Sequence, residues 1–436
     1  MQTPARKAER ASPPRRARLR VALVGACMML ACAAFVLNFA QSPRRGGVKT
    51  DRRVVYPAQP MAAPQQSGDK VTDPTFGTEI MRVTDGQKCR SGGTSYSYWP
   101  TFNRDSTRLL VMCDGKTSGL VYDFDPEGFA LGGSYEVPLV PNTSGMAVRG
   151  EDAIWSGADP DLLFAHTGGR LYSFNAGTRV FKQLADFTRL LSGKSAIQLS
   201  KSLDDDVFAF TLKDAAYKVV GYAVYRRSAN AIIHRSPDFN DEVRVDKSGK
   251  YLFVFTGTQG PGKIEVQIVD LQTGTKTDLT DDAPDHAPGH FDVGTNMIVG
   301  AGNYLVGLTA RSLSAPHKFT NILDLRAEKE YGGYHVSMLA DDERWALLSF
   351  PPYTASGVFA GEVFQVSTDG SQRVRRLFHH RAAVASYYDS PRANISRDGR
   401  FVAFTSNMGD PKRRDLYVAR ITPAPPAPQV RPRRVP

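Results

Sequence analysis

The feature that most constrains the fold is a short pattern that recurs along the chain. Its clearest copy lies near the end, where Asp398 and Gly399 precede an apolar run at 401–405. Asp-Gly is a hairpin signal, because a tight two-residue turn requires positive φ and glycine adopts it freely. The alternating segment 415–421 predicts a further strand. Such a small antiparallel sheet cannot bury both of its faces alone, so it needs neighbours of the same kind.

Six further segments have the same form, a polar turn followed by an apolar run, and lie about 40 to 57 residues apart, at 103–112, 158–165, 203–211, 246–255, 293–300 and 339–348. Seven units of this length, each with room for four short strands, are typical of a β-propeller. The sequence therefore predicts an all-β fold of seven blades.

The innermost strands of the blades are predicted at 98–102, 153–156, 196–199, 242–245, 290–293, 335–338 and 392–395. Blade seven has only three strands before the chain turns to proline. The alternating segment 79–84 can supply the missing outer strand, which would close the ring and remove two open sheet edges. We therefore expect one domain over residues 78–421.

The last repeat resembles that of the TolB-like propellers, whose pattern is serine-proline-aspartate-glycine, two variable residues, alanine-phenylalanine, then serine-asparagine or serine-arginine. The sequence matches it with Ser396, Asp398 and Gly399 and with residues 403–407, Arg397 standing in place of proline. The resemblance covers 78–421 and implies the fold; it says little about function, because propellers have many activities.

The N-terminal segment has the pattern of a membrane anchor. Residues 1–20 are strongly basic, and residues 21–40 are apolar apart from Asn38. About twenty apolar residues can span a bilayer as a helix, and the basic flank predicts a cytoplasmic N-terminus. We expect a single-pass protein of the cytoplasmic membrane with its propeller on the periplasmic or extracellular side. A cleaved signal peptide is the alternative.

The net charge of +11 belongs mainly to the two ends of the chain. Residues 1–77 carry 13 basic and 4 acidic side chains, and residues 422–436 add three arginines. A nearly neutral propeller does not predict a nucleic-acid partner. The compositions of 41–77 and 422–436, rich in proline and poor in apolar residues, predict a flexible linker and a disordered tail.

Cys89 and Cys113 are the cysteines outside the apolar segment. In an exported domain they can form a disulfide, because Cys89 is predicted in the approach to blade one and Cys113 at the end of its second strand. Two buried free thiols are the other interpretation.

The loops that enter the innermost strands are expected to gather at one mouth of the central channel. The candidate ligand-binding residues there are Tyr98, Trp99, His290, Asp292, His335, Tyr388 and Arg392. Aromatic rings beside Arg and Asp suit a sugar or a peptide, and His290 and His335 could hold a divalent metal with Asp292. The third interpretation is that these residues only pack the mouth.

The seven blades also resemble oligogalacturonate lyases, propellers whose metal is held by histidines and a glutamine at this mouth. Their last blade carries histidine-proline, two variable residues, then serine-proline-aspartate-glycine; here Arg392 stands at the histidine position, and His335 could match another lyase histidine. No nucleophile elbow or phosphate loop is present, and no catalytic residue is assigned. We expect a non-catalytic binding module for a cell-envelope protein or an acidic polysaccharide, with a metal-dependent polysaccharide lyase as the alternative.

Overall fold

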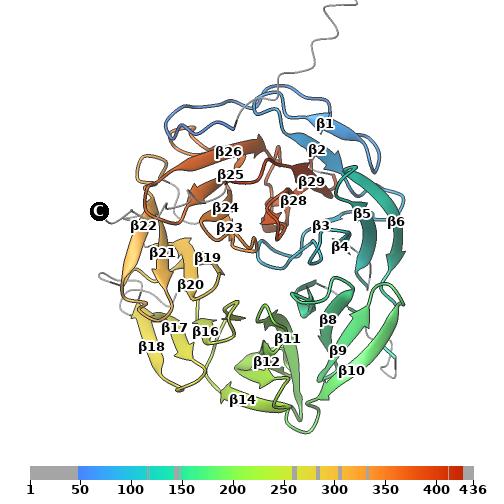
Figure 1. Cartoon of the computed structure of the whole chain (residues 1–436), viewed down its shortest axis with the longest axis vertical. Helices are drawn as coiled ribbons and strands as arrows, with labels where there is room; N and C mark the ends of the chain where they lie inside the picture. Colours follow the sequence, from blue (N-terminus) through green and yellow to red (C-terminus); the bar gives the residue numbers. More distant parts are fainter. Residues whose placement is uncertain are drawn as a thin grey trace, which may run out of the picture. The chain divides into compact units, whose positions relative to one another are not determined.

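The repeated pattern folds into seven antiparallel sheets, as the sequence predicts. The computed structural model describes residues 48–425 except 115, 117, 142–146, 149, 258–262, 281–284, 303–306, 330–332 and 411. Figure 1 shows the sheets around a common centre, with β3, β11, β19 and β23 innermost and β6, β10, β14, β18 and β22 outermost. The ring is therefore a seven-bladed β-propeller.

Six blades contain four consecutive strands each. Blades one to three are β3 (Gly92–Gly93), β4 (Arg108–Cys113), β5 (Leu120–Asp125), β6 (Ala130–Glu136); β7 (Ala153–Trp155), β8 (Leu162–Thr167), β9 (Arg170–Asn175), β10 (Val180–Asp186); and β11 (Lys194–Lys201), β12 (Val207–Asp214), β13 (Val219–Arg226), β14 (Ala231–Ser236). Blades four to six are β15 (Glu242–Val245), β16 (Tyr251–Phe255), β17 (Ile264–Asp270), β18 (Lys276–Thr280); β19 (Gly289–Val293), β20 (Met297–Ala301), β21 (Leu308–Ser312), β22 (Phe319–Leu323); and β23 (His335–Ser337), β24 (Trp345–Ser349), β25 (Glu362–Ser367), β26 (Val374–His379).

Blade seven joins the two ends of the propeller. Its order is β1 (Lys70–Thr72), β2 (Glu79–Arg82), β29 (Asp415–Arg420), β28 (Phe401–Ser406) and β27 (Asn394–Ile395). Ile80 pairs with Ala419 and Met81 with Val418, so the predicted closure by the N-terminal strand is confirmed. The extra strand β1 was missed, because three residues of mixed exposure give almost no alternating signal.

The aspartates of the repeated turns link neighbouring blades. Asp246 is fully buried, and one of its carboxylate oxygens accepts the backbone N–H groups of Lys250 and Tyr251. The other oxygen accepts the N–H of Asn296 in the next blade at 3.0 Å. A carboxylate can accept backbone N–H groups both from its own turn and from the neighbouring blade. This double role explains why acidic residues recur in the pattern.

Two predicted segments differ from the structure. In blade one the predicted strand 98–102 has only isolated bridges, of Phe102 with Leu109 and of Trp99 with Tyr96. The ladder instead uses Gly92 and Gly93, where an added Cβ would lie 2.3 Å from the Met112 carbonyl oxygen and 2.1 Å from Thr405 Oγ1. Only glycine fits such close approaches. The innermost strand of blade one is therefore the glycine pair, which precedes the aromatic segment 98–102 that was predicted to form it.

Residues 48–77 contact the propeller instead of forming the flexible linker that their composition predicts. Lys49 pairs with Arg376, whose guanidinium also donates to the Val54 carbonyl at 2.5 Å. The buried Asp73 accepts the backbone N–H of His379 at 3.0 Å. Polar anchors of this kind hold a segment that has few apolar residues to bury.

The predicted anchor, residues 21–40, lies outside the described residues, as do 1–20, 41–47 and 426–436. Within the part that is described, no helix is both long enough and apolar enough to cross a bilayer.

Candidate functional site

The mouth of the channel is defined here by Tyr96, His290, His335, Tyr387, Tyr388 and Arg392. Five of these six residues begin an innermost strand or lie in a segment that leads into one, and Tyr96 follows the innermost strand of blade one. His335 begins β23, His290 is the second residue of β19, and Arg392 lies two residues before β27. The tyrosines come from the loop after β3 and from the short helix η2 (Tyr387–Asp389). The prediction that strand starts meet at one end of the ring agrees with these ring contacts.

Two mouth residues have left-handed backbone conformations. The φ angles of His290 and Arg392 are both 40°. The register of β19 against β20 shifts between Gly289 and Asp292, so His290 lies in a bulge. Gln198 of β11 has φ 58° at a similar shift. Non-glycine residues adopt this conformation at a cost, and bulges commonly redirect side chains beside functional sites.

His335 is buried, with 3% of its surface exposed, and neither ring nitrogen has a hydrogen-bond partner among the described residues. Its ring packs edge-on against Tyr96 at 5.2 Å and against His290 at 5.7 Å between centroids. Burial, followed by the charges of His290 and Arg392, lowers the pKa of His335 well below its usual value. The imidazole is therefore neutral at pH 7, with one donor and one acceptor that the fold leaves unused.

Arg392 is also buried, at 8% exposure. It donates to the carbonyls of Ser95 and Tyr388, at 3.2 Å each, while its Nε has no partner in the described structure. Burial lowers the pKa of its guanidinium, although an arginine stays charged at pH 7. Arg392 therefore holds the mouth together through these two hydrogen bonds.

Exposed aromatic rings surround these two buried groups. Tyr387 is 54% exposed and Tyr388 61% exposed. The guanidinium of Arg392 lies 5.8 Å from the Tyr387 ring centroid and 6.0 Å from that of Tyr388. Tyrosine faces and edges next to a cation and an imidazole make a surface that is apolar in part and rich in hydrogen-bonding groups.

Three predicted ligand residues belong to the structural core of the channel. Tyr98 is buried, donates its hydroxyl to Glu242, and lies 4.4 Å from the Arg244 guanidinium. The buried indole of Trp99 donates to the Leu199 carbonyl at 3.0 Å. Both side chains are satisfied inside the protein, so they form a layer across the channel below the mouth.

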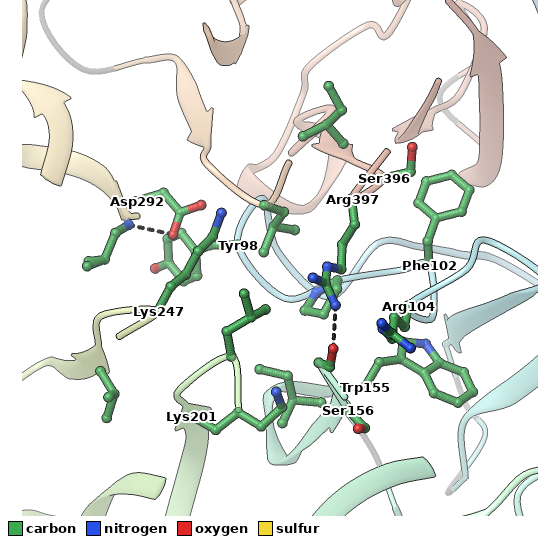
Figure 2. Close-up of a pocket in the computed structure, with 18 of the residues that line it drawn as sticks. Tyr98, Phe102, Arg104, Trp155, Ser156, Lys201, Lys247, Asp292, Ser396 and Arg397 are labelled. Carbon is green, nitrogen blue, oxygen red and sulfur yellow. Dashed lines mark hydrogen bonds between the residues drawn. The ribbon is translucent and has the colours of Figure 1, made fainter. Parts of the chain in front are cut away.

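Asp292 belongs to the same buried layer. Its two carboxylate oxygens accept the backbone N–H groups of Val293 at 2.7 Å and Met338 at 2.5 Å. Burial raises its pKa to about 6, although Arg244 opposes this. Figure 2 shows Asp292 and Tyr98 among the residues that line a cavity.

The residues at the mouth do not fit a divalent metal. Among the described residues, no group of three or more histidine, cysteine, aspartate or glutamate side chains is arranged to hold one. His290 and His335 lie beside each other, but both oxygens of Asp292 are engaged by backbone amides. The charge of Arg392, which already lowers the pKa of His335, would also repel a cation.

Two polar residues near the mouth were missed by the sequence reasoning. Burial raises the pKa of Glu151, while a hydrogen bond with Gln198 and the charge of Arg392 oppose the shift. Gln198 belongs to β11, whose apolar neighbours gave no reason to single it out. Its position in an innermost strand was the signal that could have identified it.

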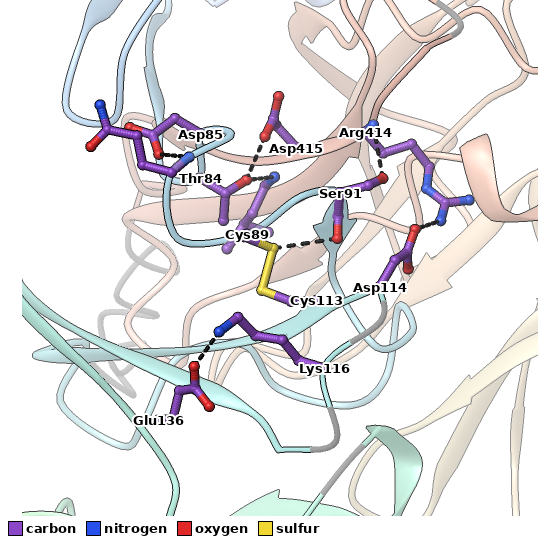
Figure 3. The surroundings of a disulfide bond; sticks show 12 residues. Thr84, Asp85, Cys89, Ser91, Cys113, Asp114, Lys116, Glu136, Arg414 and Asp415 are labelled. Atoms are coloured by element: carbon purple, nitrogen blue, oxygen red, sulfur yellow. Dashed lines mark hydrogen bonds and ion pairs between the residues drawn. A yellow bond between two sulfur atoms is a disulfide. The ribbon is translucent and has the colours of Figure 1, made fainter.

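Cys89 and Cys113 form a disulfide with a Cα–Cα distance of 5.4 Å. Figure 3 shows that the bond connects the approach to blade one with the end of β4, close to Thr84 and Asp415 of the closing blade. Asp415 accepts the Thr84 hydroxyl at 2.7 Å. The disulfide thus lies where the first and last blades meet.

Comparisons with known proteins support the fold. No protein-family model matches the sequence, and no curated protein matches it. An oligogalacturonate lyase from Vibrio parahaemolyticus is similar in structure, with a TM-score of 0.60, 11% identity, and coverage of 82% of this chain and 97% of that one. An oligogalacturonate lyase in complex with manganese has the same TM-score and 10% identity, covering 86% of this chain and 98% of that one. TolB from Acinetobacter baumannii has a TM-score of 0.34 and 17% identity, covering 69% and 59%.

Proposed function

We propose that this propeller is a binding module whose mouth takes an acidic polysaccharide. The observation that carries the proposal is the buried imidazole of His335, whose two ring nitrogens have no partner among the described residues. Burying an unpaired polar group costs about 1 to 3 kcal/mol. Sugar hydroxyls both donate and accept, so a bound sugar would remove this cost.

The other groups of the mouth suit the same ligand. Exposed Tyr387 and Tyr388 offer flat apolar faces to a sugar ring. The positive charge of Arg392 beside these rings favours uronic-acid units over neutral sugars. The left-handed backbone of His290 and Arg392 is the kind of strain that persists at ligand sites.

Binding of the full-length chain to polygalacturonate, with dextran as the neutral polymer, tests the proposal. We expect saturable binding to the acidic polymer and a loss of at least about tenfold in Tyr388→Ala, since aromatic stacking contributes about 1 to 3 kcal/mol in comparable sites. Tyr353→Ala is the matched control, because Tyr353 is 71% exposed and lies outside the mouth. Equal binding by both variants, or a failure to bind any acidic glycan, would refute the proposal.

The alternative activity is a polysaccharide lyase, and one observation favours it. The neutral imidazole of His335 can accept a proton, and it lies close enough to Arg392 for that charge to affect its pKa. The bound polymer should therefore be assayed for shortening after incubation. Cleavage that disappears in His335→Gln, while binding remains, would identify an enzyme.

We further propose that residues 21–40 anchor the chain in the cytoplasmic membrane and that the propeller lies outside the cytoplasm. The disulfide between Cys89 and Cys113 supports this location, since disulfides persist in oxidising compartments. A reporter fused after Gly77 should be active only when exported. Activity of a reporter restricted to the cytoplasm would contradict the topology.

A further inference from the structure

A cavity lies beside Tyr98, and basic residues predominate among the charged side chains that line it. Its described lining includes five basic side chains and one carboxylate, that of Asp292. The basic residues are Arg104, Lys201, Arg244, Lys247 and Arg397. We call this cavity the exit pocket. Its cavity volume is about 70 Å³.

The exit pocket lies at the opposite end of the channel from the mouth. Its residues come from the ends of the innermost strands, such as Lys201 at the end of β11 and Val245 at the end of β15. The mouth residues come from the strand starts. Tyr98 lines this pocket and contacts the buried Glu242 and Arg244.

Three of the cations occupy the same position of the repeated turn. In each turn one residue donates its backbone N–H to the carbonyl at the start of the next strand, and the basic residue comes directly after that donor. The pairs of donor and basic residue are Asn103 and Arg104, Asp246 and Lys247, and Ser396 and Arg397. Blades one, four and seven therefore direct a basic side chain to one point near the axis. Figure 2 shows Lys201, Lys247, Arg104 and Arg397 around this space.

The carboxylates of the protein neutralise these cations only in part. Lys201 pairs with Asp205 at 2.6 Å, Lys247 with Glu343 at 2.9 Å, and Arg397 with Asp341 at 2.9 Å. Arg104 is exposed and has no ion pair with another described residue. Arg244 is 5% exposed and lies 3.7 Å from a carboxylate oxygen of Glu242, but its Nη1 has no hydrogen-bond partner among the described residues.

Three of the paired cations lie in a poorly solvated space. The side chains of Lys201, Lys247 and Arg397 are only 4%, 12% and 19% exposed. Burial lowers the pKa of Lys201, and the charge of Arg397 lowers it further against the opposing effect of Asp205. Like charges that repel each other out of water are stabilised by a bound anion.

We propose that the exit pocket binds a small, multiply charged oxyanion of the phosphate or polycarboxylate class. Planar guanidinium donors from Arg104 and Arg397 and point charges from Lys201 and Lys247 converge on it from four blades. Because most of these groups are buried, the ligand is a soluble molecule that enters the channel. A lipid headgroup held in a membrane surface would not reach them. This proposal is independent of glycan binding at the mouth.

Titration calorimetry of the full-length chain with pyrophosphate and with citrate tests it. We expect one site per chain and an affinity that falls by about tenfold in Arg104→Gln, as for the loss of a charge-assisted hydrogen bond. Arg104 is exposed, so this variant should fold normally. Arg104→Lys should retain most of the affinity, and Tyr388→Ala at the mouth should retain all of it.

Arg326→Gln is the charge-matched control, because Arg326 is 69% exposed and pairs with Asp324 away from the pocket. Equal affinities in wild type and Arg104→Gln, equal losses in both glutamine variants, or no saturable binding of either anion would overturn the proposal. Displacement of pyrophosphate by vesicles of phosphatidylglycerol would contradict the soluble source of the ligand.

Discussion

Glu242 is a carboxyl group inside the channel, next to Tyr98 and Arg244. Burial raises its pKa to about 8, and the charge of Arg244 opposes this only in part. In the unfolded chain the pKa is about 4.3. Below about pH 4 both states hold the proton, so the group does not affect the free energy of unfolding there.

As the pH rises from about 4 to about 8, the unfolded state loses this proton first, and the free energy of unfolding must fall. Glu242→Gln cannot ionise and should lack this fall, so at pH 9 it should be more stable than wild type by about 3 to 5 kcal/mol. Urea unfolding at pH 5 and pH 9 measures the difference. Glu127→Gln, at a side chain that is 82% exposed, should behave like wild type at both pH values.

Arg392→Ala should lower stability as well as ligand affinity. The side chain is 8% exposed and donates to the carbonyls of Ser95 and Tyr388, so its removal leaves two part-buried acceptors without this donor. We expect a loss of about 1 to 3 kcal/mol in urea unfolding. An unchanged unfolding midpoint would show that water replaces the guanidinium and that the mouth is more solvated than its packing indicates.

The sequence predicted individual mouth residues with mixed success, for a physical reason. A strand start could be assigned from the repeat, so His290, His335 and Arg392 were placed together. Whether a side chain at that level meets a ligand or a neighbour depends on partners from other blades. Glu242, which accepts the Tyr98 hydroxyl, lies 144 positions along the chain from it.

At the scale of elements, β2 is the strand on which the closing blade depends. Ile80, Met81 and Val83 are fully buried, and β2 pairs with β29 along its whole length. Alternation identified this strand. Gly92 and Gly93 of β3 carry no such signal, because their role is to permit close backbone contact.

Truncation at Asp85 should destabilise the propeller much more than truncation at Thr78. A protein that starts at Thr78 has lost β1 with the rest of residues 48–77 but still has β2. The comparison therefore isolates the contribution of β2. Losing three buried side chains and a ladder should cost about 5 kcal/mol. Equal thermal unfolding of the two truncated proteins would contradict the importance of β2.

The disulfide closes a loop with a sequence separation of 24 residues. In the chain-entropy model its removal costs about 3 kcal/mol. The double variant Cys89→Ser with Cys113→Ser should therefore unfold at lower urea concentration than the oxidised protein and match the reduced protein. A variant as stable as the oxidised protein would show that the contacts of Thr84 and Asp415 suffice to hold the two blades together.

At the scale of the whole molecule, the number of blades and the site of closure could be predicted because both follow from a repeated local pattern. Net charge alone did not indicate the exit pocket. The propeller is nearly neutral, yet the turns of blades one, four and seven direct their basic residues to one axis. A site at the centre of a ring thus depends on which positions of the repeat face inward. The net charge of the chain does not show this, because it adds all charges regardless of their position.

Ring closure by β2 and β29 also sets an order in time. During synthesis β2 emerges early, but its partner β29 ends at Arg420 and emerges last. Blades one to six are complete before then, while β2 has only the short β1 beside it. Each of these blades contains only strands that follow one another in the chain, so they can form in sequence as loops of short closure. The ring becomes a closed object only in a final step, and a nascent chain stalled before residue 415 would expose the apolar faces of β2 and β28 to any other chain nearby.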